Sequence, residues 1–212
     1  MEQLIQEDMK VHIVTNGDYI SEKEDILQIA VNHRLNLQFS LSIDEEGKCN
    51  SRAVRKLDEL GIKTNIFLYP LTNENLIPNK DVLFHKGREI ILLFPVSMGN
   101  NSGVHITPNE WIIIINKWKK YFENKSIVLK AQTAFKDVES YFNNETLKEF
   151  DYTDGKFLDC DGKLYDCCLV AEKSHIMQKE YCCDSKSCPL LEKYSESGYN
   201  TTCPFNLISI IP

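Results

Sequence analysis

Residues 11–70 read VHIVTNGDYISEKEDILQIAVNHRLNLQFSLSIDEEGKCNSRAVRKLDELGIKTNIFLYP, and this stretch decides the fold class of the chain. It holds three short apolar runs with the composition of strands, Val11–Val14, Leu37–Leu41 and Lys63–Leu68. A helical pattern separates each run from the next. A strand that recurs about every 26 residues with a helix between predicts a parallel sheet of the α/β class.

Local signals mark where the two helices begin and end. Ser21 and Glu24 stand at the spacing of a capping box, ahead of an apolar face made by Ile26, Leu27, Ala30 and Val31. The second helix is expected over about residues 51–60, and Gly61 is placed to stop it.

The same alternation continues beyond residue 70. A fourth strand is predicted at Glu89–Phe94, and a fifth at Ser126–Leu129. Between them, Thr107-Pro108-Asn109-Glu110 combines a capping box with proline at the first helical position, which predicts another helix. Residues 1–150 are therefore expected to form one unit, whose parallel sheet is either open or barrel-like.

Polar residues follow the predicted strands where functional groups of parallel sheets collect. Thr15 and Asn16 follow the first strand, and Ser42 and Asp44 end the second. Asn and Ser are also common turn and cap residues, so a purely structural role stays open for each of them.

Composition narrows the class of protein. The chain has 212 residues, enough for one good core and a small appended module. Its net charge of −7 and the lack of a basic stripe argue against a nucleic-acid partner. The longest apolar runs, such as Trp111–Ile115, are far too short to cross a membrane, and the first ten residues contain no signal-peptide pattern. The expected location is the cytoplasm.

After Phe150 the composition changes, and residues 151–212 are expected to form a small Cys-rich module. Lys156–Asp159 and Lys163–Cys167 read as a β-hairpin around Asp161-Gly162. Seven of the chain's eight cysteines lie in this region: Cys160, Cys167, Cys168, Cys182, Cys183, Cys188 and Cys203.

Dense thiols in a reducing compartment favour a metal site over disulfides. Four thiolates suffice for zinc or one iron–sulfur cluster. Adjacent residues on a strand point in opposite directions, so one cysteine of each adjacent pair is expected to ligate, which leaves enough for one cluster. His175 lies between the pairs and is a candidate ligand, but the expectation for it is a solvent-exposed histidine in a loop; Cys49 is expected to be incidental.

These segments resemble the radical S-adenosylmethionine (SAM) enzymes. VHIVTNG at 11–17 is similar to their third strand, LQFSLSID at 37–44 to their fourth, and GIKTNIFLYPLTNEN at 61–75 to their fifth. REIILLFPVSMGNNSG at 88–103, followed by TPNEW, resembles the sixth. The resemblance implies a partial (β/α) barrel in which Ser42 and Asp44 would contact SAM, with Thr15 and Asn16 nearby and Asn65 on the fifth strand.

The Cys-rich tail resembles the SPASM or twitch extensions of that family, which bind auxiliary 4Fe–4S clusters. Gly162-x4-Cys167 matches their hairpin, Cys182-x5-Cys188 matches a later spacing, and Cys203 would be the closing cysteine. The resemblance implies one cluster, with zinc as the alternative metal. Its ligands would come from Cys160, Cys167, Cys182, Cys183, Cys188 and Cys203.

The family's CxxxCxxC loop and its GGEP-like motif are absent from the sequence. The expectation is therefore a C-terminal portion of a radical SAM oxidoreductase or maturase that does not cleave SAM alone. It would be a fragment, a truncated gene product or one half of a split enzyme. A separate chain would supply the other part of the barrel, and a peptide or protein is the expected substrate. The alternatives are a non-catalytic, metal-stabilised protein-binding module and a thiol-based redox protein, although the usual CxxC is missing.

Overall fold

The computed structural model describes residues 10–95, 105–142, 157–158, 163–165, 188, 194–203 and 206–210. Their helices and strands are, in chain order, β1 (Val11–Thr15), α2 (Asp18–Glu22), α3 (Glu24–Asn32), β2 (Leu37–Ile43), α4 (Ser51–Glu59), β3 (Thr64–Leu68), α5 (Lys80–Leu83), β4 (Glu89–Leu92), α6 (Pro108–Phe122), β5 (Val128–Gln132), α7 (Lys136–Phe142), β6 (Phe157–Leu158), β7 (Leu164–Tyr165) and β8 (Leu207–Ile210). Within these described residues, no helix is both long and apolar enough to cross a membrane.

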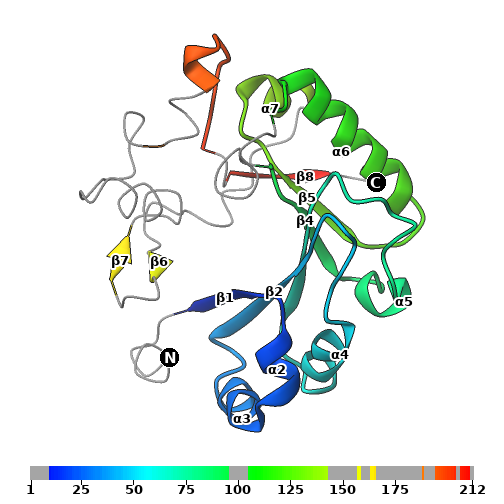
Figure 1. Cartoon of the computed structure of the whole chain (residues 1–212), viewed down its shortest axis with the longest axis vertical. Coiled ribbons are helices and arrows are strands. Elements are labelled where there is room, and N and C mark those ends of the chain that lie inside the picture. Colours follow the sequence, from blue (N-terminus) through cyan, green and yellow to red (C-terminus); the bar gives the residue numbers. More distant parts are fainter. Residues whose placement is uncertain are drawn as a thin grey trace. The chain divides into compact units, whose positions relative to one another are not determined.

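Six strands form one sheet in the order β1-β2-β3-β4-β5-β8 (Figure 1). The pairs β1–β2, β2–β3 and β3–β4 are all parallel, with Val11 opposite Leu37, Phe39 opposite Thr64, and Ile66 opposite Ile90. The predicted α/β class with a mostly parallel sheet is therefore confirmed.

Contacts at Gly17 identify which face of the sheet the helices cover. Gly17 has φ +87°, and a Cβ there would lie 2.7 Å from Leu41 Cδ2 and 2.9 Å from Ala53 Cβ. Leu41 of β2 therefore points toward α4, and the residues opposite it in the register point the same way. We call this side the helix face; its apolar members are Val11, Ile13, Leu37, Phe39, Leu41, Ile43, Ile66, Leu68, Ile90 and Leu92. Figure 1 shows α2, α3 and α4 together on one side of β1 and β2.

The predicted strands agree with the observed ones to within two residues, except for the fifth. Its prediction, Ser126–Leu129, is wrong at both ends, because the strand is Val128–Gln132. Ser126 has φ +48°, a left-handed conformation that cannot continue a strand. The buried Lys130 and Gln132 extend the strand beyond its apolar part.

The capping box predicted at Ser21 and Glu24 is also wrong. The segment forms two helices instead of one, and Ser21 lies inside the first, α2. Helix α3 begins at Glu24 with Lys23 as its N-cap and no side-chain cap hydrogen bond. Further on, α4 ends before Gly61 as expected, and Gly61 has φ +67°.

The capping box of α6 is present as predicted. The backbone N–H of Thr107 donates to Glu110 Oε2 at 2.8 Å, and that of Glu110 donates to Thr107 Oγ1 at 3.3 Å. The helix buries a face of large residues, Trp111, Ile115, Trp118 and Phe122. The Trp118 indole N–H donates to the Pro70 carbonyl at 2.8 Å.

The chain divides into two compact units. Unit 1 comprises Met1–Leu93, Ile114–Lys130 and Ile210–Pro212, and unit 2 comprises Phe94–Ile113 and Ala131–Ser209. In unit 2, β6 and β7 pair antiparallel, so the predicted hairpin is present, while its Asp161-Gly162 turn lies outside the described residues. A module boundary near residue 150 stays a prediction, since residues 143–156 lie outside them as well.

Within unit 2, main-chain hydrogen bonds tie residues 133–136 to residues 200–206. Thr133 N donates to Asn206 O at 3.0 Å, Thr202 N to Ala134 O at 3.1 Å, and Lys136 N to Asn200 O at 2.9 Å. We call this set of bonds the clamp. It leads the chain into β8, where Leu207, Ile208 and Ile210 are buried.

Candidate functional site

The residues that follow β1 hold their own turn together. Thr15 Oγ1 accepts from Gly17 N at 3.0 Å, and Asn16 Oδ1 accepts from Asp18 N at 3.2 Å. The Asp18 carboxylate accepts from Asn16 Nδ2 at 2.8 Å and from Asn50 Nδ2 at 3.1 Å, which links this turn to the start of α4. Thr15 and Asn16, both predicted as cofactor-binding residues, therefore have a turn-forming role.

Asp44, another predicted cofactor-binding residue, organises the loop after β2. Its Oδ1 accepts from the backbone N–H of Glu46 at 3.0 Å and of Lys48 at 2.8 Å. Its main-chain carbonyl accepts from the Thr72 hydroxyl at 2.7 Å. These bonds tie the loop after β2 to the loop after β3, and the Asp44 side chain remains exposed.

The other two predicted cofactor-binding residues, Ser42 and Asn65, lie on the side of the sheet opposite to the helix face. We call this side the polar face; its polar members are His12, Gln38, Ser40, Ser42, Asn65, Glu89 and Lys130. Ser42 stands opposite Phe67 near the carboxyl end of β2 and is half-buried. Asn65 stands opposite Ser40, nearer the start of its strand, and is 1% exposed.

Two groups of side-chain contacts cross the polar face. His12 Nε2 lies 2.7 Å from Ser40 Oγ. Asn65 Nδ2 donates to Glu89 Oε1 at 3.1 Å, and Lys130 Nζ lies 3.1 Å from Glu89 Oε2. The Lys130 and Glu89 side chains are only 5% and 15% exposed, so this ion pair is largely removed from water.

The polar face carries little net charge. Burial lowers the pKa of His12, and the nearby Lys63 lowers it further, so this imidazole is neutral at pH 7. The charges of Glu89 and Lys130 cancel. In addition, Gln38 Nε2 is buried and has no hydrogen-bond partner among the described residues. Such a face offers a ligand hydrogen-bond partners rather than a net charge.

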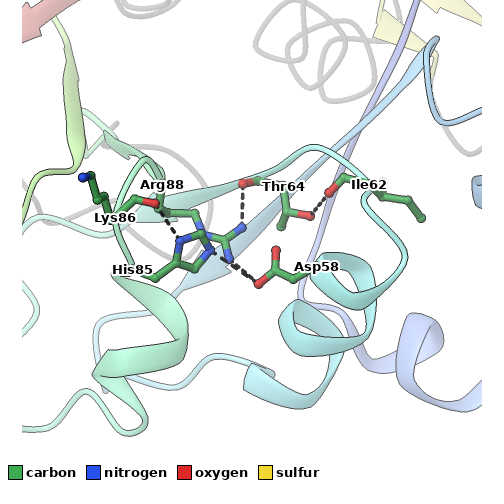
Figure 2. Close-up of polar contacts among 6 residues, drawn as sticks. All are labelled: Asp58, Ile62, Thr64, His85, Lys86 and Arg88. Atoms are coloured by element: carbon green, nitrogen blue, oxygen red, sulfur yellow. Dashed lines mark hydrogen bonds and ion pairs between the residues drawn. The ribbon is translucent and has the colours of Figure 1, made fainter.

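A second polar cluster lies on the helix side, at the amino ends of β3 and β4 (Figure 2). Arg88, with a 2% exposed side chain, donates to Asp58 Oδ2 at 2.5 Å and to the Thr64 carbonyl at 2.8 Å. His85 Nε2 lies 3.6 Å from the same Asp58 oxygen. These contacts attach the end of α4 to the two strands, which is an architectural role, since functional groups of parallel sheets collect at the other end.

Only three cysteines belong to the described residues. Cys49 is half-buried, and burial raises the pKa of its thiol to about 12, which makes it unreactive. Cys188 is buried and Cys203 half-buried. Cys160, Cys167, Cys168, Cys182 and Cys183 lie outside the described residues, as does His175. Among those described, no three His, Cys, Asp or Glu side chains come together as metal ligands, so the metal site stays a prediction.

Sequence reasoning missed five members of the polar face: His12, Gln38, Ser40, Glu89 and Lys130. A signal was present, because strands covered by helices on both faces read as continuous apolar runs. Here His12 interrupts the first strand, and Gln38, Ser40 and Ser42 alternate with apolar residues in the second. This alternation indicates a sheet with one face that is not packed as a hydrophobic core.

Comparison of the chain with protein-family models, with curated proteins and with solved structures finds no match.

Proposed function

We propose that this chain is the C-terminal portion of a radical SAM-type oxidoreductase or maturase that carries an auxiliary 4Fe–4S cluster. The proposal joins the sequence resemblance to one structural observation, the polar face of a mostly parallel sheet. A (β/α) barrel turns its helices outward and lines its interior with the opposite face of each strand. A polar, half-buried inner face is what a barrel that binds a polar ligand requires.

Each predicted cofactor-binding residue would have the role that its position in the structure allows. Ser42, half-buried near the carboxyl end of β2, is the best-placed contact for SAM or substrate. Thr15, Asn16 and Asp44 would shape the loops around the ligand, because their side chains already bind backbone amides of those loops. Asn65 would orient Glu89 rather than touch SAM. Bound SAM would supply the hydrogen-abstraction chemistry of the family, on a peptide or protein substrate.

The auxiliary cluster would be held in the Cys-rich tail. Cys203 follows directly on the clamp, so its main chain is held at Thr202 and Asn206 on either side. A ligand that is fixed before the metal arrives costs less ordering entropy on binding. Cys188 would be a second ligand from the described residues, and its burial suits a thiolate that is removed from water by a cluster.

Anaerobic reconstitution with iron and sulfide tests this proposal. The expected product holds about four irons per chain and has broad visible absorbance. Cys188→Ser and Cys203→Ser should each lower the iron content, whereas Cys49→Ser, a matched change outside the tail, should not. Colourless protein with one tightly bound zinc would instead support the alternative function, a zinc-stabilised protein-binding module.

The chain alone is not expected to cleave SAM, because the CxxxCxxC motif is absent from its sequence. Incubation of the reconstituted protein with SAM and dithionite should produce no 5′-deoxyadenosine. Addition of a separate chain that carries CxxxCxxC should restore the cleavage. Cleavage of SAM to 5′-deoxyadenosine by this polypeptide alone would contradict the proposal that another chain must supply the SAM-binding cluster.

A further inference from the structure

The turn after β1 contains Asn16-Gly17, the only asparagine–glycine pair in the sequence. Such a pair is prone to spontaneous deamidation, because glycine has no Cβ to hinder the approach of its main-chain nitrogen to the asparagine side chain. Asn16 is exposed, so water reaches its carboxamide. Both reactants of a deamidation are therefore present in this turn.

The reaction converts Asn16 into an acidic residue with water as the only reagent. The Gly17 main-chain nitrogen gives its proton to hydroxide and forms a bond to Asn16 Cγ. The bond from Cγ to Nδ2 then breaks, and Nδ2 takes up a proton and leaves as ammonia. Water opens the resulting succinimide ring at one of its two carbonyls, which gives either aspartate or isoaspartate.

Three hydrogen bonds oppose this reaction in the folded turn. The Gly17 N–H donates to Thr15 Oγ1 at 3.0 Å, which holds the proton that must leave. The Asn16 carboxamide is held at both ends, since Oδ1 accepts from Asp18 N at 3.2 Å and Nδ2 donates to Asp18 Oδ2 at 2.8 Å. Ring closure must shorten a non-bonded contact of about 3 Å between Gly17 N and Asn16 Cγ to a bond of about 1.5 Å, which pulls the carboxamide away from Asp18.

Packing prevents Gly17 from making this movement in place of Asn16. Gly17 is buried, and a Cβ there would lie 2.7 Å from Leu41 Cδ2, 2.9 Å from Ala53 Cβ and 3.2 Å from Asn50 Cβ. Close packing of this kind leaves the main chain little room to shift. The nitrogen is thus held by packing, and the carboxamide is held by hydrogen bonds.

We propose that Asn16 is a deamidation site that the folded turn protects and that local opening of the turn exposes. The rate in native protein then equals the rate of the unfolded chain multiplied by the fraction of molecules whose turn is open. No cysteine or metal takes part, so the proposal does not rest on the iron–sulfur assignment.

The product of the reaction cannot re-form the original turn. Deamidation replaces the Nδ2 donor of Asn16 by a carboxylate oxygen, which then faces the acceptor Asp18 Oδ2. Isoaspartate also adds one methylene to the main chain between β1 and α2. Asp18 accepts from Asn50 at the start of α4 as well, so the change also affects that helix. Deamidation would thus mark, irreversibly, each molecule whose turn has opened.

The test follows the peptide Val11–Lys23, which trypsin releases from the full-length protein after incubation at neutral pH and physiological temperature. Mass spectrometry detects the replacement of –NH2 by –OH, and chromatography separates isoaspartate from aspartate. Native protein should deamidate at Asn16 at least about tenfold more slowly than the same chain in concentrated urea. Equal rates in the two conditions would overturn the proposal.

A matched pair of threonine variants tests the hydrogen bonds of the turn. Thr15→Val keeps the shape of the side chain but removes the acceptor of the Gly17 N–H. The rate in native protein should therefore rise about fivefold, while the rate in urea stays the same. Thr107→Val removes the capping hydroxyl of α6, away from the turn, and should change neither rate.

Hydrogen exchange of the Gly17 amide in the wild-type protein measures the opening without any variant. This exchange should be slowed at least about tenfold relative to the unfolded chain. An unprotected Gly17 amide, an unchanged rate of deamidation in folded Thr15→Val, or an equal rise in Thr107→Val would each contradict the proposal. Failure to bind iron would affect only the proposed function.

Discussion

The helix face and the polar face belong to the same strands, yet the buried residues of the two faces are held by different interactions. On the helix face, Leu41, Ile66 and Ile90 are completely buried and pack as a core. On the polar face, Ser40 and Asn65 are buried equally well, but they are held by hydrogen bonds. Apolar burial is proportional to area and tolerates small shifts, whereas buried polar groups need specific partners. The difference indicates that apolar area stabilises one face, whereas specific hydrogen bonds hold the other.

The largest expected effect comes from the helix face. Leu41→Ala should lower the free energy of unfolding by about 3 kcal/mol, because it leaves a cavity beneath α4. Ser42→Ala, the neighbouring residue on the polar face, should cost less than about 0.5 kcal/mol. Urea denaturation followed by circular dichroism measures both. Equal losses would mean that the two faces do not differ in the way described.

A somewhat smaller loss is expected when the ion pair of the polar face is broken. Lys130→Met should cost about 2–3 kcal/mol, because the Glu89 carboxylate then stays largely buried without its cation. The double variant Lys130→Met/Glu89→Gln should recover part of this loss. If the single variant were as stable as the wild type, water would reach Glu89 freely and the pair would not be buried in solution.

A third prediction concerns Gly17, whose backbone lies close to side chains of the helix face. Gly17→Ala should cost about 2 kcal/mol, because the new Cβ meets Leu41 and Ala53 while the backbone stays at φ +87°. Gly61→Ala is the matched control. Its φ is +67°, but nothing lies within 4 Å of the added Cβ, so only the backbone strain of about 1 kcal/mol remains. Thermal unfolding of the two variants should therefore separate the steric cost from the conformational cost.

The smallest expected effect is the pH dependence that His12 confers. Burial lowers its pKa in the folded state below the unfolded value of 6.5, so the unfolded chain takes up the proton first. The free energy of unfolding should therefore fall as the pH drops through 6.5, and His12→Gln should make this fall shallower. His33→Gln, outside the sheet, serves as the control in the same titration. A steeper fall in His12→Gln would show that the sign is wrong.

Much of the α/β architecture could be predicted because its signals are local. The apolar runs located β1 to β4, and the capping box of α6 is a contact between residues three apart in sequence. Prediction failed at Ser21, where a residue with cap chemistry lies inside α2 because the turn at Gly17 starts a helix earlier. Local propensity cannot decide between a helix that starts at Gly17 and one that starts at Ser21. The choice depends on where the turn packs against Leu41 and Ala53, which are distant in sequence.

The candidate site was predictable only in part, for a related reason. Strand ends identified Ser42, but the links from Asn65 to Glu89 and from Glu89 to Lys130 join three strands that are distant in sequence. Their meeting depends on strand order and register, which short motifs do not specify. The predicted strand-end ligands Thr15, Asn16 and Asp44 illustrate the converse, since turn chemistry and ligand chemistry use the same residue types.

The clamp also has a consequence for how this molecule folds. Its bond between Lys136 and Asn200 joins residues that are 200 − 136 = 64 positions apart, whereas β1 to β4 assemble from neighbouring βα units. Closing so long a loop costs entropy before any contact stabilises it, so long-range pairings of this kind form slowly. The docking of β8 should thus be the late step of folding, and the slow kinetic phase should belong to the end of the chain rather than to the parallel sheet.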